Sequence, residues 1–139
     1  MFKNILLPVD LTDRHQPALA TAAELARQGG GDITLLHVVE IIPGLSLDEE
    51  RVFYHRLERM ARAHLERLGE ALTRRQVPWH LEVRFGARAP EVARYAREQG
   101  SQLVVLTSPQ PDQDNPAAGW ASLSYKIGVL SPCPVLLVK

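Results

Sequence analysis

This 139-residue chain has little cysteine, no excess of charge of one sign and no long apolar run. Its one cysteine, Cys133, cannot form a disulfide within the chain, which fits a reducing compartment and predicts a cytoplasmic protein. The 16 basic and 16 acidic side chains cancel, so we expect no nucleic-acid or membrane partner. No apolar run approaches the roughly 20 residues that span a bilayer, and we expect no signal peptide.

The apolar pattern predicts a single α/β domain over residues 1–139. Five segments have the length and composition of strands: 5–9, 33–39, 79–84, 102–106 and 135–138. Helical spacing fills the segments between them: one helix capped by Thr12 or Asp13 and ended by glycines 29–31, then helices over about 47–75, 90–99 and 117–130. Strands that alternate with helices predict a doubly wound parallel five-stranded sheet with helices on both faces.

The loop after the fourth predicted strand lacks the glycines that usually line a phosphate site in this architecture. From Thr107 onward there is no glycine until Gly119, and the loop carries three prolines and two aspartates instead. Each proline removes a backbone N–H donor, and each aspartate repels a triphosphate by roughly 1 kcal/mol at a few ångströms in water. The loop therefore predicts that ATP is not bound firmly.

Three stretches, in this order and spacing, resemble the universal stress protein family. They are Ile5-Leu6-Leu7-Pro8-Val9-Asp10 with Leu36-His37-Val38, then Phe85-Gly86-Ala87-Arg88-Ala89-Pro90-Glu91-Val92, and finally Ser131-Pro132-Cys133-Pro134-Val135-Leu136-Leu137-Val138. The resemblance covers essentially the whole chain. It implies the strand order 3-2-1-4-5, a role in stress survival, and a homodimer paired through the last strand.

Family members that bind ATP carry the motif G-x2-G-x9-G-[ST] after strand four. Its glycine positions fall on Thr107, Gln110 and Ala121, so all three glycines are missing, and the second gap is one residue longer than the motif. The resemblance places a ribose contact at Asp10, a base contact at Val38 and phosphate hydroxyls at Ser122 and Ser124. The nucleotide-site positions to test are therefore Asp10, Val38, Thr107, Ser108, Gln110, Ser122 and Ser124.

Each of these residues also has a plainer interpretation. Asp10 could cap a helix or form a turn, and Ser122 and Ser124 are more typical of polar residues at a helix start than of ligand donors. Trp120 could fill the vacated phosphate position or join a dimer contact. These alternatives stay open at the level of sequence.

Other chemically active side chains do not form a recognisable catalytic or metal-binding pattern. Cys133 is interpreted as a packed residue, His64 as a satisfied core or interface histidine, and His37 as polar lining beside a cleft. The arginines of the long helix are interleaved with glutamates, which favours a solvated face with ion pairs. No nucleophile has a base placed by the sequence pattern, so we expect no enzyme and no bound metal.

Two hypotheses about function follow. The first is a universal stress-like, non-enzymatic homodimer without firm ATP binding and without a firm cofactor. The second is a sensor of the same fold that binds ATP, AMP or adenosine through Asp10, Val38 and Ser122. In both, the last strand would form the dimer interface, because a bare apolar edge needs a partner. The interface residues are Val135, Leu136, Leu137 and Val138.

Overall fold

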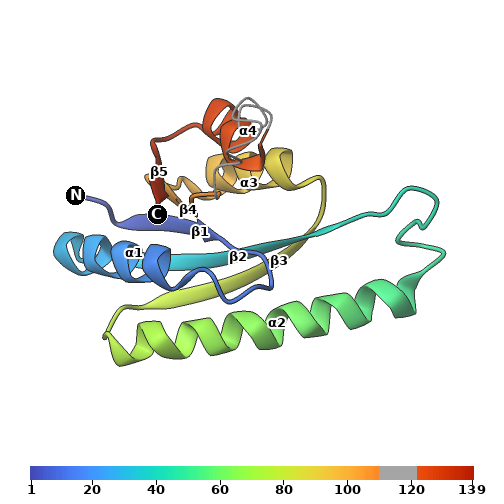
Figure 1. The fold of residues 1–139 in the computed structure, drawn as a ribbon, viewed down its shortest axis with the longest axis horizontal. Helices are drawn as coiled ribbons and strands as arrows, with labels where there is room; N and C mark the ends of the chain where they lie inside the picture. The colour runs from blue at the N-terminus through green and yellow to red at the C-terminus, as the bar shows by residue number, and fades with distance from the viewer. Residues whose placement is uncertain (110–121) are drawn as a thin grey trace, which may run out of the picture.

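The protein was analysed as a computed structural model that describes residues 1–109 and 122–139. Five strands form one parallel sheet (Figure 1). They are β1 (Asn4–Pro8), β2 (Asp32–Glu40), β3 (Trp79–Gly86), β4 (Leu103–Thr107) and β5 (Val135–Val138). Their order across the sheet is β3-β2-β1-β4-β5, which confirms the predicted topology, and each predicted strand lies within two residues of an observed one.

Helices cover both faces of the sheet (Figure 1). They are α1 (Gln16–Gly29), α2 (Arg51–Arg74), α3 (Arg88–Gln99) and α4 (Leu123–Leu130). Alternate residues of the central strands point to opposite faces, so two apolar cores form: Ile5 and Leu7 of β1 pack towards α1 and α2, whereas Leu6 packs towards α3 and α4. Within residues 1–109 and 122–139, no helix is both long enough and apolar enough to cross a membrane.

Helix starts are the part of the fold that the sequence predicted least well. Neither Thr12 nor Asp13 caps α1; the helix begins at Gln16, after His15, because Thr12 instead turns back to bond the carboxylate of Asp10. Helix α2 begins at Arg51 rather than near residue 47, and α3 begins at Arg88 rather than at residue 90. The prediction of one helix over 117–130 was also wrong at its start.

The backbone of Ser122 is not helical, so a helix cannot run continuously through this residue into α4. Its backbone is extended, with φ −68° and ψ 161°, and its hydroxyl accepts a hydrogen bond from the backbone N–H of Tyr125 at 3.2 Å. This is the geometry of an N-cap, so α4 starts at Leu123. The predictions made for Gln110 and Trp120 lie outside the described residues.

Edge strand β3 packs against α2 partly through the indole of Trp79. The indole of Trp79 lies so close to Gly69 that an added Cβ would come within 2.3 Å of the ring. The indole N–H also donates to Thr73 Oγ1 at 2.8 Å. Glycine in the middle of α2 therefore serves close packing rather than a turn.

At the opposite edge of the sheet, strand β5 is apolar, and no other described strand pairs with its outer side. Leu136 and Leu137 are 37% and 47% exposed, although β5 is the edge strand on this side of the sheet. Neighbouring α4 adds exposed Val129 and Leu130. Apolar side chains thus continue from the helix on to the strand.

Candidate functional site

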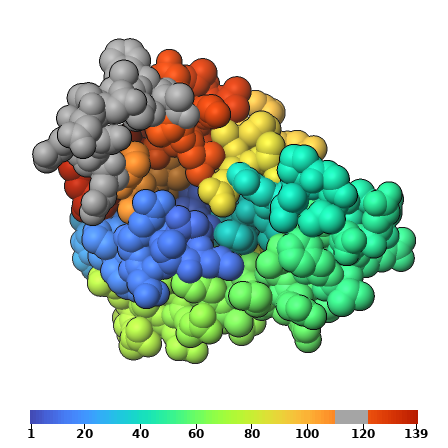
Figure 2. All heavy atoms as spheres, turned by 45° about the vertical axis from the view of Figure 1, so that its right-hand side comes forward, coloured from blue at the N-terminus to red at the C-terminus, as the bar shows by residue number. Residues whose placement is uncertain are grey.

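A pocket opens at the carboxyl ends of β1, β2 and β4. In such sheets this is where the strand order reverses and where ligands bind. In the space-filling view the surface is hollowed between the segment after β1, in blue, and helices α3 and α4, in yellow and red-orange (Figure 2). The pocket is lined by Pro8, Val9, Asp10, Arg14, His15, Leu36, His37, Val38, Arg88, Val92, Leu106, Thr107, Pro109, Ser122, Leu123, Ser124 and Ile127.

The size of this pocket favours a small ligand. The described residues enclose about 130 Å³, which is below the roughly 300–1,000 Å³ of typical sites for drug-sized ligands. Its walls are mainly aliphatic, with polar groups contributed by the segment after β1, by the end of β4 and by the start of α4.

Asp10 is held by three neighbours in the turn that follows β1. Its Oδ1 accepts hydrogen bonds from the backbone N–H of Thr12 at 3.1 Å and from the Thr12 hydroxyl at 2.5 Å, while Oδ2 accepts from the Arg14 guanidinium at 2.8 Å. The plainer interpretation of Asp10 as a turn former is therefore correct. Partial burial alone would raise the pKa of this carboxyl, but the bonds from Thr12, then His15 and Arg14, outweigh it and lower the pKa well below its usual range.

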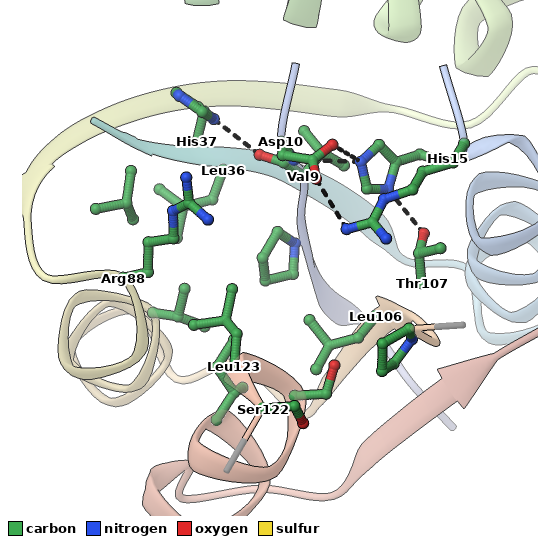
Figure 3. A pocket seen from close by; sticks show the side chains of 17 residues that line it. Val9, Asp10, His15, Leu36, His37, Arg88, Leu106, Thr107, Ser122 and Leu123 are labelled. Carbon is green, nitrogen blue, oxygen red and sulfur yellow. Dashed lines mark hydrogen bonds and ion pairs between the residues drawn. The ribbon is translucent and has the colours of Figure 1, made fainter. Parts of the chain in front are cut away.

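His15 connects Asp10 to the end of β4 (Figure 3). Its Nε2 lies 2.6 Å from Asp10 Oδ1, and its Nδ1 lies 2.7 Å from Thr107 Oγ1. The residue is only 3% exposed, so protein groups rather than water satisfy both ring nitrogens. His15 thereby joins residues that follow two different strands at the floor of the pocket.

The carboxylate determines which ring nitrogen carries a hydrogen. Asp10 is ionised and can only accept, so Nε2 must donate to it. The backbone N–H of Asp10 also lies 3.2 Å from Nε2, but a protonated nitrogen has no lone pair to accept it. Of the two contacts, the shorter one to the carboxylate is therefore the hydrogen bond.

His37 and Arg88 line the opposite side of the pocket (Figure 3). His37 Nδ1 donates to the carbonyl of Val9 at 2.9 Å, and burial lowers the pKa of His37, with the Val9 bond opposing that shift. Arg88 contacts Glu40 at 3.2 Å through Nε. The prediction that His37 is polar lining is confirmed.

The structure brings most of the predicted nucleotide-site positions together. Asp10, Val38, Thr107, Ser122 and Ser124 all line the pocket. Ser108 does not line it. The backbone N–H of Ser108 instead donates to Val138 at 2.7 Å, which extends the pairing between β4 and β5.

Two other predictions concern side chains away from the pocket. Cys133 is half-buried and packs against the core beneath α3 and α4, and burial raises the pKa of its thiol, as a packed residue requires.

His64 was expected to be satisfied, yet its Nε2 is buried without a hydrogen-bond partner in the described part of the chain. That expectation was wrong, because position on an apolar stripe says nothing about what each ring nitrogen meets.

Three basic side chains of the pocket were not singled out as site residues from the sequence: Arg14, His15 and Arg88. His15 was missed because it lies in a turn, outside any periodic segment, and because its partner Thr107 is distant in sequence. Among residues 1–109 and 122–139, no group of three potential ligand side chains could hold a metal ion.

The parallel sheet, its strand order and the pocket where that order reverses define a doubly wound α/β protein. The model of the universal stress protein family matches residues 1–139, and the chain belongs to this family. It is 33% identical to universal stress protein G of Escherichia coli O157:H7 over 116 residues, which is 80% of this chain and 82% of that protein.

Solved structures with low sequence identity share the fold. Universal stress protein UspA of Lactobacillus plantarum superposes with a TM-score of 0.79 at 20% identity, covering 99% of this chain and 98% of that one. A universal stress protein of Archaeoglobus fulgidus, solved in complex with dAMP, superposes with a TM-score of 0.71 at 20% identity, covering 99% and 98%.

Proposed function

We propose that this universal stress protein is a non-enzymatic, cytoplasmic homodimer that does not bind ATP firmly. One observation supports the proposal: Asp10 and Val38 line the pocket, and Thr107 stands at its edge where the motif has a glycine. At the end of β4, Thr107 takes the place of a motif glycine, and its side chain is bonded to His15. A Cβ and a committed hydroxyl there obstruct the close backbone approach that phosphates need.

The N-terminus of α4 also has less to offer a triphosphate than the motif would. The Ser122 hydroxyl accepts from Tyr125 as an N-cap, so one of its lone pairs is already used. Helix α4 has eight residues, which leaves a modest dipole at its start. Together with the small pocket, this favours a ligand with at most one phosphate.

The second candidate is a sensor for AMP or adenosine, and the pocket favours it over an ATP sensor. Val38, 5% exposed, offers an apolar surface for a base, and Asp10 offers carboxylate oxygens for ribose hydroxyls. The Archaeoglobus fulgidus protein with dAMP shows that a related fold holds a nucleoside monophosphate. In the present chain this remains a proposal.

Titration calorimetry separates the two candidates. The first predicts no heat of binding at micromolar concentrations of ATP, AMP or adenosine, whereas the second predicts saturable binding of AMP or adenosine but not of ATP. Micromolar affinity for ATP would contradict both. Val38→Arg, which places a charge where the base would stack, should abolish any binding that uses this pocket.

The dimer is proposed from the exposed edge of β5. An apolar edge strand with exposed Leu136 and Leu137 is an aggregation hazard unless another chain covers it. Pairing with the same strand of a second copy about a two-fold axis would close the edge and bury the apolar side chains of α4. Sedimentation velocity at micromolar protein should therefore show a dimer, and a monomer would contradict the proposal.

A further inference from the structure

Both ring nitrogens of His15 are occupied, one on each side of the pocket floor. Nε2 donates to Asp10, which Thr12 and Arg14 keep ionised, so Nε2 carries its hydrogen whether the ring is neutral or protonated. A change of protonation at His15 therefore occurs at Nδ1. Among residues 1–109 and 122–139, the hydrogen-bond partner of that nitrogen is the hydroxyl of Thr107, at 2.7 Å.

The protonation of His15 decides what Thr107 presents to a ligand. When the ring is neutral, Nδ1 has a lone pair and accepts the hydroxyl hydrogen of Thr107, so only oxygen lone pairs remain for the pocket. When the ring is protonated, Nδ1–H donates to the Thr107 oxygen, and the hydroxyl hydrogen is free to turn towards the pocket. Beside neutral His15, Thr107 can therefore only accept a hydrogen bond from a ligand, whereas beside the imidazolium it can also donate one.

A ligand anion and a ligand hydroxyl place different demands on this pair, because only the anion requires Thr107 to donate. An anionic oxygen needs a donor and is attracted by the imidazolium and by Arg14, whereas the lone pairs of Thr107 beside a neutral ring would repel it. A ligand hydroxyl or amino group can donate to those same lone pairs. The ring is almost completely excluded from solvent, so water does not screen this difference.

We propose that His15, acting through Thr107, selects the charge of the ligand: a singly charged phosphate ester binds together with one proton, and a neutral nucleoside binds without it. The inference rests on the proposed adenosine-type site and adds which residue discriminates between a nucleotide and a nucleoside. Thr107 contacts the ligand in this proposal. His15 is a positioning residue that acts through Thr107.

Other charged or titratable groups line the same pocket as His15. The segment after β1 contributes Asp10 and Arg14, with exposed Asp13 nearby in the chain, β2 contributes His37, and α3 contributes Arg88. The described pocket residues of α4 carry no titratable side chain. His37 is the other histidine of the pocket, and its Nδ1 is bound to the Val9 carbonyl rather than to Thr107.

Calorimetric titrations with 3′,5′-cyclic AMP and with adenosine, between about pH 5.5 and 8.5, test the inference. The phosphodiester of cyclic AMP keeps one negative charge throughout this range, so its own titration does not interfere. Its affinity should fall by up to about tenfold per pH unit above the protonation midpoint of His15. Adenosine affinity should vary by less than about twofold over the same range. Repeating the cyclic AMP titration in buffers with different heats of ionisation should show proton uptake on binding.

Variants identify the groups responsible. Thr107→Val removes the hydroxyl and should abolish the pH dependence of cyclic AMP binding, whereas Thr107→Ser should keep it. His15→Gln should also abolish it. His37→Asn, which can still donate to the Val9 carbonyl, is the matched control and should keep it.

The outcomes distinguish this inference from the proposed function. Adenosine binding combined with a pH-independent affinity for cyclic AMP, or with no proton uptake, would overturn the inference and leave the adenosine-type site standing. A pH dependence that survives in Thr107→Val would overturn it as well. Failure of both ligands to bind would overturn the adenosine-type site together with this inference, and it would leave the first candidate function, a homodimer without firm nucleotide binding, standing. Proton uptake is measured on the unmodified protein, so the test does not depend on whether any variant folds.

Discussion

Thr107 Oγ1 lies 2.7 Å from Nδ1 of His15, although 92 residues separate them in the chain. The contact links the start of α1 to the end of β4, and His15 is buried. Because the two residues follow adjacent strands of the sheet, the bond spans the point where the strand order reverses.

Replacing Thr107 with valine should reduce the free energy of unfolding. The substitution keeps the side-chain volume but leaves a buried ring nitrogen without its partner, at a cost of about 1–3 kcal/mol. Urea denaturation followed by circular dichroism measures the change. Thr107→Ser keeps the hydroxyl and should cost less; equal losses in the two variants would assign the effect to the methyl group instead.

Gly69→Ala should destabilise the protein although alanine favours helices. The new Cβ would lie 2.3 Å from the Trp79 ring, so α2 and β3 would have to separate, which typically costs about 1–3 kcal/mol. Thermal denaturation should show a lower midpoint. Unchanged or increased stability would mean that the indole moves aside without loss.

Gly128→Ala in α4 is the matched control with the opposite sign. No atom lies within 4 Å of the Cβ that would be added there, among the residues the structure describes. The change should stabilise the protein by about 0.5–1 kcal/mol, because glycine is a poor helix former. A loss of stability would contradict the helical assignment of this position.

His37 should make the protein less stable as the pH falls. Its pKa in the folded state is lowered, chiefly by burial, below the value of about 6.5 in the unfolded chain. As the pH falls through that value the unfolded chain binds the proton first, so the stabilising contribution is present above it and is lost below it.

Chemical denaturation at about pH 7.5 and about pH 5 measures this effect. His37→Asn removes the titrating ring and should lose less stability between the two pH values than the parent protein does. His55→Asn, on the exposed face of α2, is the control and should leave the difference unchanged. A parent and a His37→Asn variant with the same pH dependence would refute the assignment.

Leu137→Glu should convert the proposed dimer into a monomer. The side chain is 47% exposed on β5, and a charge at this position in both copies would repel across a two-fold axis. Sedimentation velocity would report the change in mass. Val52→Glu, at a 76% exposed apolar position on α2, should leave the assembly intact; dissociation by both variants would point to a non-specific effect of charge.

The fold could be predicted from the sequence because its signals are local. Runs such as Leu103–Thr107 are apolar on both faces, which is typical of buried parallel strands, and alternation with helices fixes the handedness of the crossovers. Helix starts were less predictable, since Thr12 and Ser122 are both good capping residues. Of these two, only Ser122 caps a helix, because the hydroxyl of Thr12 is hydrogen-bonded to Asp10 instead.

The site was predictable only in part. Asp10 and Val38 follow or end strands that meet at one edge of the sheet, so their convergence follows from topology. The contacts of His15 with Asp10 and Thr107 do not follow from topology, because spacing along the chain does not show which turn will contact a neighbouring strand. The structural sign of this contact is that His15 is buried although it lies in a turn. Burial at a position outside a periodic segment cannot be predicted from the sequence pattern.

The contact between Trp79 and Gly69 also gives the protein a built-in optical probe. The chain has two tryptophans, so Trp120→Phe would leave Trp79 as the sole indole emitter. Its ring lies against α2, at the sheet edge opposite β5 and across β2 from the strands that form the pocket floor. A shift in its emission would therefore show the long helix lifting from the sheet, and it would do so without an attached dye.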